Sequence, residues 1–125
     1  MSHNLNLVIW NVRGLNARAR RLAIRSLIAT TDASIVCLQE TKMALIDPSI
    51  VLETLGLDFD GFLSLPAEGT RGGILLAWKS RVVTISDPLL TTNALTARVA
   101  SPAGTPWWIS IVYGPQDEDD KVAFL

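Results

Sequence analysis

The chain has 125 residues and a formal net charge of -1; 49% of its residues are hydrophobic and 18% are charged. This length suits one domain with a single core. A net charge near zero excludes a global attraction to nucleic acid, so phosphate contacts must come from a local basic group. No apolar run approaches the ~18 residues of a membrane span and no signal peptide is present, so we expect an intracellular protein of the nucleus or cytoplasm with no membrane partner.

A strand, a helix and a second strand are predicted first. Alternation from Leu5 to Ile9 indicates a strand that ends in the glycine-containing loop after Asn11. A helix is predicted over residues 17–30, because small and apolar side chains share one face at helical spacing: Ala19, Leu22, Ala23, Ser26 and Leu27. This order indicates a crossover between parallel strands, whose carboxyl ends then lie at one edge of the sheet.

The second strand, Ile35–Leu38, is a continuous apolar run that indicates burial on both faces. The single cysteine, Cys37, lies inside it, which allows no intrachain disulfide and suits a small core residue. Glu40 follows at the mouth of the strand, where a carboxylate stays ionised only if a cation or hydrogen-bond donors satisfy it. We therefore expect Glu40 to meet Asn11 at the shared edge.

Five of the eleven basic residues lie within thirteen positions, at Arg13, Arg18, Arg20, Arg21 and Arg25. Three of them, Arg18, Arg21 and Arg25, share a helix face. That face would either follow a phosphate backbone or form the solvated outer side of the helix. Arg13 differs because it lies in the loop beside Asn11.

A short helix is predicted from Pro48 to Leu55, with Asp47 as its N-cap and Gly56 closing it. Short strands at hairpin spacing follow and predict an antiparallel meander in a mixed sheet, over residues 59–65, 74–78, 82–85, 95–99 and 107–112. Tyr113 to Gln116 form a third polar group at a strand end. Asp117, Asp119 and Asp120 fit an acidic helix start, and residues 121–125 predict a helix interrupted in its second turn, as in a truncated longer chain.

The sequence contains three motifs at predicted strand ends, in this order along the chain: Trp10–Leu15, Leu38–Lys42 and Val112–Gln116. Together they resemble the endonuclease/exonuclease/phosphatase superfamily, and most closely the apurinic-type endonuclease domain of plant non-LTR (LINE-type) retrotransposons. The resemblance covers the whole chain but only the amino-terminal half of the family domain. It implies an α/β (α+β) fold with a mixed, mostly antiparallel sheet and flanking helices, half of a four-layer sandwich, with residues 1–125 as one truncated domain.

The resemblance also implies site residues. Glu40 would bind a divalent metal, usually Mg²⁺, while Asn11 would position metal and phosphate and Tyr113 would contact the phosphate. Lys42 resembles the family lysine that pairs with the glutamate. Arg13 stands where many repair enzymes carry an acid. One strand-end carboxylate suffices as an anchor, because Mg²⁺ keeps several waters.

The family's Asp-x-Asn and Ser-Asp-His motifs are missing from this sequence, and the only histidine, His3, lies before the first strand. Without a general base, we expect no hydrolysis by this chain alone. Three hypotheses remain open. The chain is part of a Mg²⁺-dependent DNA endonuclease completed by a second polypeptide, or an interaction module whose uncovered apolar sheet face binds a protein or a second copy. The third is a non-cleaving nucleic-acid binder that uses Arg13, Arg18, Arg21 and Lys42.

Overall fold

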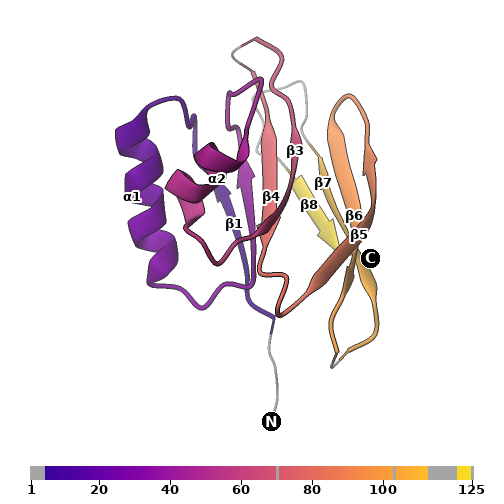
Figure 1. Cartoon of the computed structure of the whole chain (residues 1–125). Coiled ribbons are helices and arrows are strands. Elements are labelled where there is room, and N and C mark those ends of the chain that lie inside the picture. Colours follow the sequence, from indigo (N-terminus) through magenta and orange to yellow (C-terminus); the bar gives the residue numbers. More distant parts are fainter. Residues whose placement is uncertain (1–4, 70, 103, 113–120, 125) are drawn as a thin grey trace.

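The computed structural model describes residues 5–69, 71–102 and 104–112, together with the backbone of residues 121–124. Two helices, α1 (Arg18–Ala29) and α2 (Pro48–Leu55), cover one face of a first sheet, and a second sheet packs on the other face (Figure 1). The described residues therefore form three layers. No helix in these ranges is long and apolar enough to cross a membrane.

The first sheet has the strand order β1-β2-β4-β3. Its strands are β1 (Leu7–Asn11), β2 (Ile35–Gln39), β4 (Ile74–Trp78) and β3 (Gly61–Leu65). β1 and β2 are parallel, as the crossover predicted, and the other two pairs are antiparallel. In this register Asn11 lies opposite Gln39, so the carboxyl ends of β1 and β2 form one rim.

The second sheet is antiparallel, with the order β5-β6-β7-β8. Its strands are β5 (Thr84–Leu90), β6 (Ala94–Ala100), β7 (Trp107–Val112) and β8 (Lys121–Phe124). The meander is confirmed for β5 to β7, but it forms a separate sheet rather than continuing the first one. β5 also extends further than the predicted residues 82–85.

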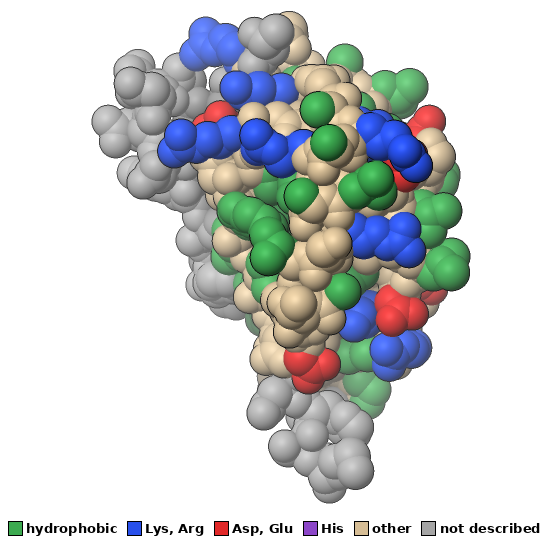
Figure 2. Space-filling view, turned by 90° about the vertical axis from the view of Figure 1, so that its left-hand side faces the viewer, with side chains coloured by type: hydrophobic (Ala, Val, Ile, Leu, Met, Phe, Trp, Pro, Cys, Tyr) green, Lys and Arg blue, Asp and Glu red, His purple; other side chains and the backbone are tan. Residues whose placement is uncertain are grey.

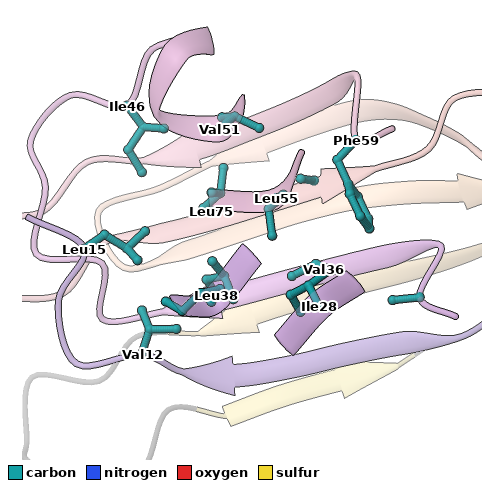
Figure 3. Packing of buried hydrophobic residues seen from close by; sticks show 13 residues of the cluster. Val12, Leu15, Ile28, Val36, Leu38, Ile46, Val51, Leu55, Phe59 and Leu75 are labelled. Carbon is teal, nitrogen blue, oxygen red and sulfur yellow. The ribbon is translucent and has the colours of Figure 1, made fainter. Parts of the chain in front are cut away.

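Two clusters of buried side chains explain why β2 is apolar throughout. Val36 and Leu38 point toward the helices and join the first cluster (Figure 3). Ile35 and Cys37 point the other way, into the second cluster between the sheets. Because β2 is covered on both faces, all five of its residues are buried. The mixed, mostly antiparallel α+β architecture predicted from the sequence is confirmed.

The predicted inner face of α1 is wrong. The helix buries Arg21, Ile24 and Ile28, whereas Leu22 and Leu27 are 36% and 53% exposed. Ile24 and Ile28 belong to the first cluster of buried side chains, and Arg21 donates hydrogen bonds to the carbonyl groups of Leu15 and Asn16 in the preceding loop. Periodicity shows which side chains share a helix face, but it does not show which face the rest of the protein covers.

The predicted helix over residues 121–125 is also wrong, because residues 121–124 form strand β8. β8 pairs with β7, Ile109 lying opposite Phe124. An open strand edge supplies backbone partners that a single helical turn cannot provide. At α2 the prediction is confirmed: the Asp47 carboxylate accepts a hydrogen bond from Ile50 N at 3.0 Å, and Gly56 ends the helix at φ 91°.

Candidate active site

Asn11 and Glu40 meet at the rim of the first sheet. Asn11 Nδ2 donates a hydrogen bond of 2.9 Å to Glu40 Oε2, while Asn11 Oδ1 accepts one of 3.2 Å from Arg13 N. The amide thus bridges the end of β2 and the loop that follows β1. Its orientation is set at both ends.

Backbone hydrogen bonds extend the sheet beyond the strand ends and hold the loop of Glu40 between two neighbours. On one side, Gly14 N donates to Glu40 O at 2.7 Å and Leu15 N to Thr41 O at 2.8 Å. On the other side, Thr41 N donates to Gly73 O at 3.1 Å. Glu40 is therefore presented by a backbone that is fixed on both flanks.

The rim also concentrates left-handed backbone conformations. Arg13 and Glu40 have φ of 55° and Lys42 has φ of 58°, a region that non-glycine residues rarely occupy. Each such residue costs on the order of 1 kcal/mol and persists only when the surroundings impose it. The hydrogen bonds on both flanks of Thr41 supply that constraint, and the conformation turns Glu40 out of the strand direction.

Gly73 allows the residues just before β4 to lie close to the loop that carries Glu40. It has φ of 94°, and a side chain there would meet the Thr41 hydroxyl, with Lys42 N only 3.2 Å from the added carbon. A glycine is required on both counts. The Gly72-Gly73 pair is thus part of the support for Glu40.

Glu40 is half-buried at the rim. Its Oε2 takes the Asn11 hydrogen bond, and neither carboxylate oxygen accepts another from the residues that the structure describes. Nor does Lys42 form an ion pair with Glu40 there. The stem of Lys42 instead lies beside Gly14, where an added carbon would be 3.7 Å from Lys42 Cδ.

The arginines predicted to contact phosphate fall into two groups. Arg13 is exposed at the rim, and the Arg18 side chain is 68% exposed. The Arg21 side chain is only 11% exposed and donates to Leu15 O at 2.7 Å, to Asn16 O at 3.0 Å and to Glu53 Oε1 at 2.8 Å. These bonds make Arg21 a link between the rim loop, α1 and α2 rather than an open phosphate ligand.

Glu53 on α2 has a lowered pKa because of this link. Hydrogen bonds from Arg21, and then from Arg18 at 3.1 Å, hold the pKa of Glu53 below its ordinary value of 4.5. The two helices are thereby joined through one carboxylate. Figure 2, a view from the α1 side, shows Lys and Arg side chains spread over this face with hydrophobic ones between them.

Sequence reasoning missed several residues that support the rim. Arg20 Nη1 donates to Val12 O at 2.7 Å, and Asn16 Nδ2 donates to Lys42 O at 2.9 Å. Gln39 is 4% exposed, and its Nε2 finds no partner among the described residues. Gln39 ends β2 and Asn16 lies in the loop after β1, which was a signal in the sequence, whereas nothing marked Arg20, in the first turn of α1, as a partner of Val12.

Other predicted site residues cannot be placed. Tyr113, His3, Asp117, Asp119 and Asp120 lie outside the described residues. The convergence of Tyr113 on Asn11 and Glu40 therefore stays a prediction.

The chain matches the model of the Endonuclease/Exonuclease/phosphatase family over residues 8–122. It belongs to this family. One segment of this family member is similar to the exodeoxyribonuclease of Bacillus subtilis (strain 168). The two are 46% identical over 39 residues, which are 31% of this chain and 16% of that protein. A segment is also similar to the DNA-(apurinic or apyrimidinic site) endonuclease 2 of Xenopus laevis, 38% identical over 52 residues, covering 39% of this chain and 10% of that one.

Solved structures share the fold. The AP endonuclease LMAP of Leishmania major has a TM-score of 0.57 at 21% identity, covering 82% of this chain and 38% of that one. The APE2 catalytic domain of Xenopus laevis has a TM-score of 0.54 at 19% sequence identity, and the match covers 90% of this chain and 46% of that one. TDP2 of D. rerio, complexed with single strand DNA product, has a TM-score of 0.53 at 23% sequence identity, and the match covers 83% of this chain and 43% of that one. This family member thus spans less than half of each of these structures.

Nucleases of this family generally use divalent metals, and the rim residues fit one. No cluster of three or more His, Cys, Asp or Glu side chains occurs within the described ranges, so a cage made only of protein ligands is not formed there. A single half-buried carboxylate with a free oxygen is the kind of anchor that Mg²⁺ accepts, because it keeps several waters.

Proposed function

We propose that this chain carries the Asn11–Glu40 wall of a Mg²⁺-dependent DNA phosphodiesterase site, descended from a plant LINE-type retrotransposon endonuclease, and that it does not hydrolyse DNA by itself. The observation that supports the proposal most strongly is the 2.9 Å hydrogen bond from Asn11 Nδ2 to Glu40 Oε2. It joins the two strand-end motifs, and Glu40 Oε1 accepts no hydrogen bond from the residues that the structure describes.

Each rim residue has a role in this proposal. Glu40 would hold the metal ion, which when bound stabilises negative charge developing on the phosphate. Asn11 keeps the Glu40 carboxylate in one orientation through its bridge to Arg13 N. The exposed Arg13 and the half-buried Lys42 would offer positive charge to the phosphates on either side. Tyr113 is proposed as a further phosphate contact.

The proposed lack of independent activity rests on missing chemistry. The sequence has no Asp-x-Asn or Ser-Asp-His motif to orient water and transfer protons. The chain also spans only 38% to 46% of the similar solved structures. Residues that carry the remaining motifs would have to complete the site.

A nicking assay on supercoiled plasmid with Mg²⁺ tests this proposal. We expect no nicking by the chain alone, and nicking when a polypeptide carrying the carboxy-terminal half of a related domain is added. Glu40→Ala should abolish the restored activity, whereas Asp58→Ala, an exposed carboxylate away from the rim, should leave it intact. Nicking by the chain alone would refute the proposed dependence, and restored nicking that survives Glu40→Ala would refute the assigned site.

Metal binding offers a readout that does not depend on activity. Mg²⁺ should raise the thermal unfolding temperature of the wild-type chain, because an ion that binds only the folded state stabilises it. The same titration on Glu40→Gln should give no increase. Equal stabilisation of both proteins would show that Mg²⁺ binds elsewhere.

An interaction module is the second candidate, supported by the outer face of the second sheet. There Trp108 and Val112 remain 38% and 36% exposed, on the side of β7 opposite the buried Ile109 and Ile111. Large exposed aromatic groups of this kind are enriched where proteins bind one another. Light scattering tests this candidate: self-association that Trp108→Ser abolishes would support it, and a monomer at micromolar concentration would exclude a homodimer.

A further inference from the structure

A pocket of about 330 Å³ lies at the end of the first sheet opposite the Asn11–Glu40 rim. At the rim, Gln39 of β2 pairs with Ile74 of β4; at the other end Ile35 pairs with Trp78, and Lys79 follows directly. This end is the lower one in Figure 1, where the carboxyl end of α1 comes down beside the sheet. The pocket is therefore separate from the site described above.

Two cations line this pocket. Lys79 Nζ lies 5.1 Å from the centre of the Phe59 ring, and Lys79 N donates to Ser34 O at 3.0 Å, which fixes the start of its side chain. Arg25 reaches in from α1, with Nε 3.6 Å from the carbon that a side chain would add at Gly56. Neither cation forms an ion pair with a carboxylate of the described residues.

Asp58 is the acidic residue of the lining, and it is exposed. Two positive charges and one negative charge leave the pocket with a net charge of +1. Its floor is apolar, since Ile28, Leu55 and Phe59 are only 3%, 5% and 6% exposed. Lys79 is half-buried and Arg25 is exposed, so Lys79 is the cation whose attraction for an anion is less screened by water.

A second, mainly apolar pocket of about 260 Å³ shares Gly56, Leu57 and Phe59 with the first. Its further lining consists of Pro48, Val51, Leu52, Phe62 and one acidic residue, Asp60. The Asp60 carboxylate accepts hydrogen bonds from Ser80 N at 2.9 Å and from Ser80 Oγ at 2.6 Å. Gly56 lines both pockets and has φ of 91°, a conformation that favours glycine, so no side chain projects from this position. We call the two neighbouring pockets the distal groove. Leu57 is 79% exposed at its edge, a high fraction for a large apolar side chain.

We propose that the distal groove binds a small amphipathic anion. Its acidic head would lie between Arg25 and Lys79, and its apolar body would extend over Phe59 toward Phe62. Ligand sites of this size are mostly apolar, with few polar groups that fix orientation, and the distal groove has that composition. Charge-assisted hydrogen bonds from the two cations would select an acid over a neutral molecule of the same shape.

Titration of the ¹⁵N-labelled chain with octanoate, followed by amide chemical shifts, tests this proposal. Saturable shifts are expected in residues 25–31, 55–62 and 79, and none at 11–15 or 39–42. Octanol, which keeps the body but lacks the charge, should bind about tenfold more weakly.

Lys79→Met and Arg25→Gln keep most of the side-chain length and should each weaken octanoate binding about tenfold. Arg98→Gln is the matched control, because Arg98 lies on β6 of the second sheet, outside the groove lining. The octanoate affinity of this variant should equal that of the wild type. Unchanged urea midpoints would show that the variants remain folded.

Several results would overturn the proposal. They include shifts centred on the Asn11–Glu40 rim, equal affinity for octanoate and octanol, and unchanged octanoate binding by Lys79→Met and Arg25→Gln. Sedimentation with phosphatidylserine vesicles in the absence of any saturable response to octanoate would also overturn it, in favour of a membrane surface.

Discussion

Asn11 Nδ2 lies 2.9 Å from Glu40 Oε2, although the two residues are 29 positions apart in the chain. The parallel register of β1 and β2 brings them together, and the left-handed conformation of Glu40 completes the approach. The same amide accepts a hydrogen bond from Arg13 N. One asparagine thus ties two strand-end loops into a single rim.

A double-mutant cycle should measure this bond. Asn11→Ala, Glu40→Ala and the double variant should give a coupling free energy of about 1 kcal/mol in urea unfolding, because the half-buried Glu40 carboxylate accepts a hydrogen bond from Asn11. Asn6→Ala with Glu40→Ala is the control pair. Asn6 bonds to Asp32 O rather than to rim residues, so these effects should add. Additive effects in the Asn11 cycle would show that the bond contributes nothing to stability.

Gly73→Ala should destabilise the chain by about 2 kcal/mol or more, because it combines a strained φ with a clash against Thr41. Gly69→Ala separates the two causes, since Gly69 has φ of 64° but no atom within 4 Å of the added carbon. We expect about 1 kcal/mol for Gly69→Ala. Equal losses in urea unfolding would mean that close approach to Thr41 plays no part.

Arg21→Met should cost about 2 to 3 kcal/mol of unfolding free energy, because it leaves the carbonyl groups of Leu15 and Asn16 without their donor. Arg18→Ala should change stability by less than about 0.5 kcal/mol, since an exposed ion pair contributes little. Similar effects of the two substitutions would contradict the structural role of Arg21. Weaker DNA retention by Arg18→Ala would support the predicted phosphate contact.

The Glu53 link should weaken at acid pH. Hydrogen bonds from Arg21, then Arg18, lower the pKa of Glu53 in the folded chain, so the unfolded chain takes up this proton at a higher pH. The stabilisation is therefore complete above the unfolded value near 4.5 and is lost as the pH falls through the folded value. Urea unfolding at decreasing pH should show a steeper loss for the wild type than for Glu53→Gln. Parallel curves would refute this linkage.

Local patterns in the sequence predicted most of the elements around the rim. The apolar run of β2 predicted a strand covered on both faces, and Asp47, Pro48 and Gly56 predicted α2. These features depend on neighbours in the chain, through side-chain periodicity and capping, and so can be deduced from residue order. The fold class followed from the same patterns together with the family resemblance.

Interactions between distant segments decided what the sequence could not. The inward face of α1 depends on carbonyl groups of the Leu15–Asn16 loop that only the fold places near Arg21. Residues 121–124 form a strand because β7 offers an open edge.

The strands that end at Asn11 and before Glu40 could be predicted from residue order, because alternation and apolar runs are local properties of the chain. The folded chain was needed to show that these two side chains bond, that Arg21 is enclosed and that Arg25 and Lys79 line one pocket. Those relationships depend on strand register and packing, which join residues that lie far apart in the chain.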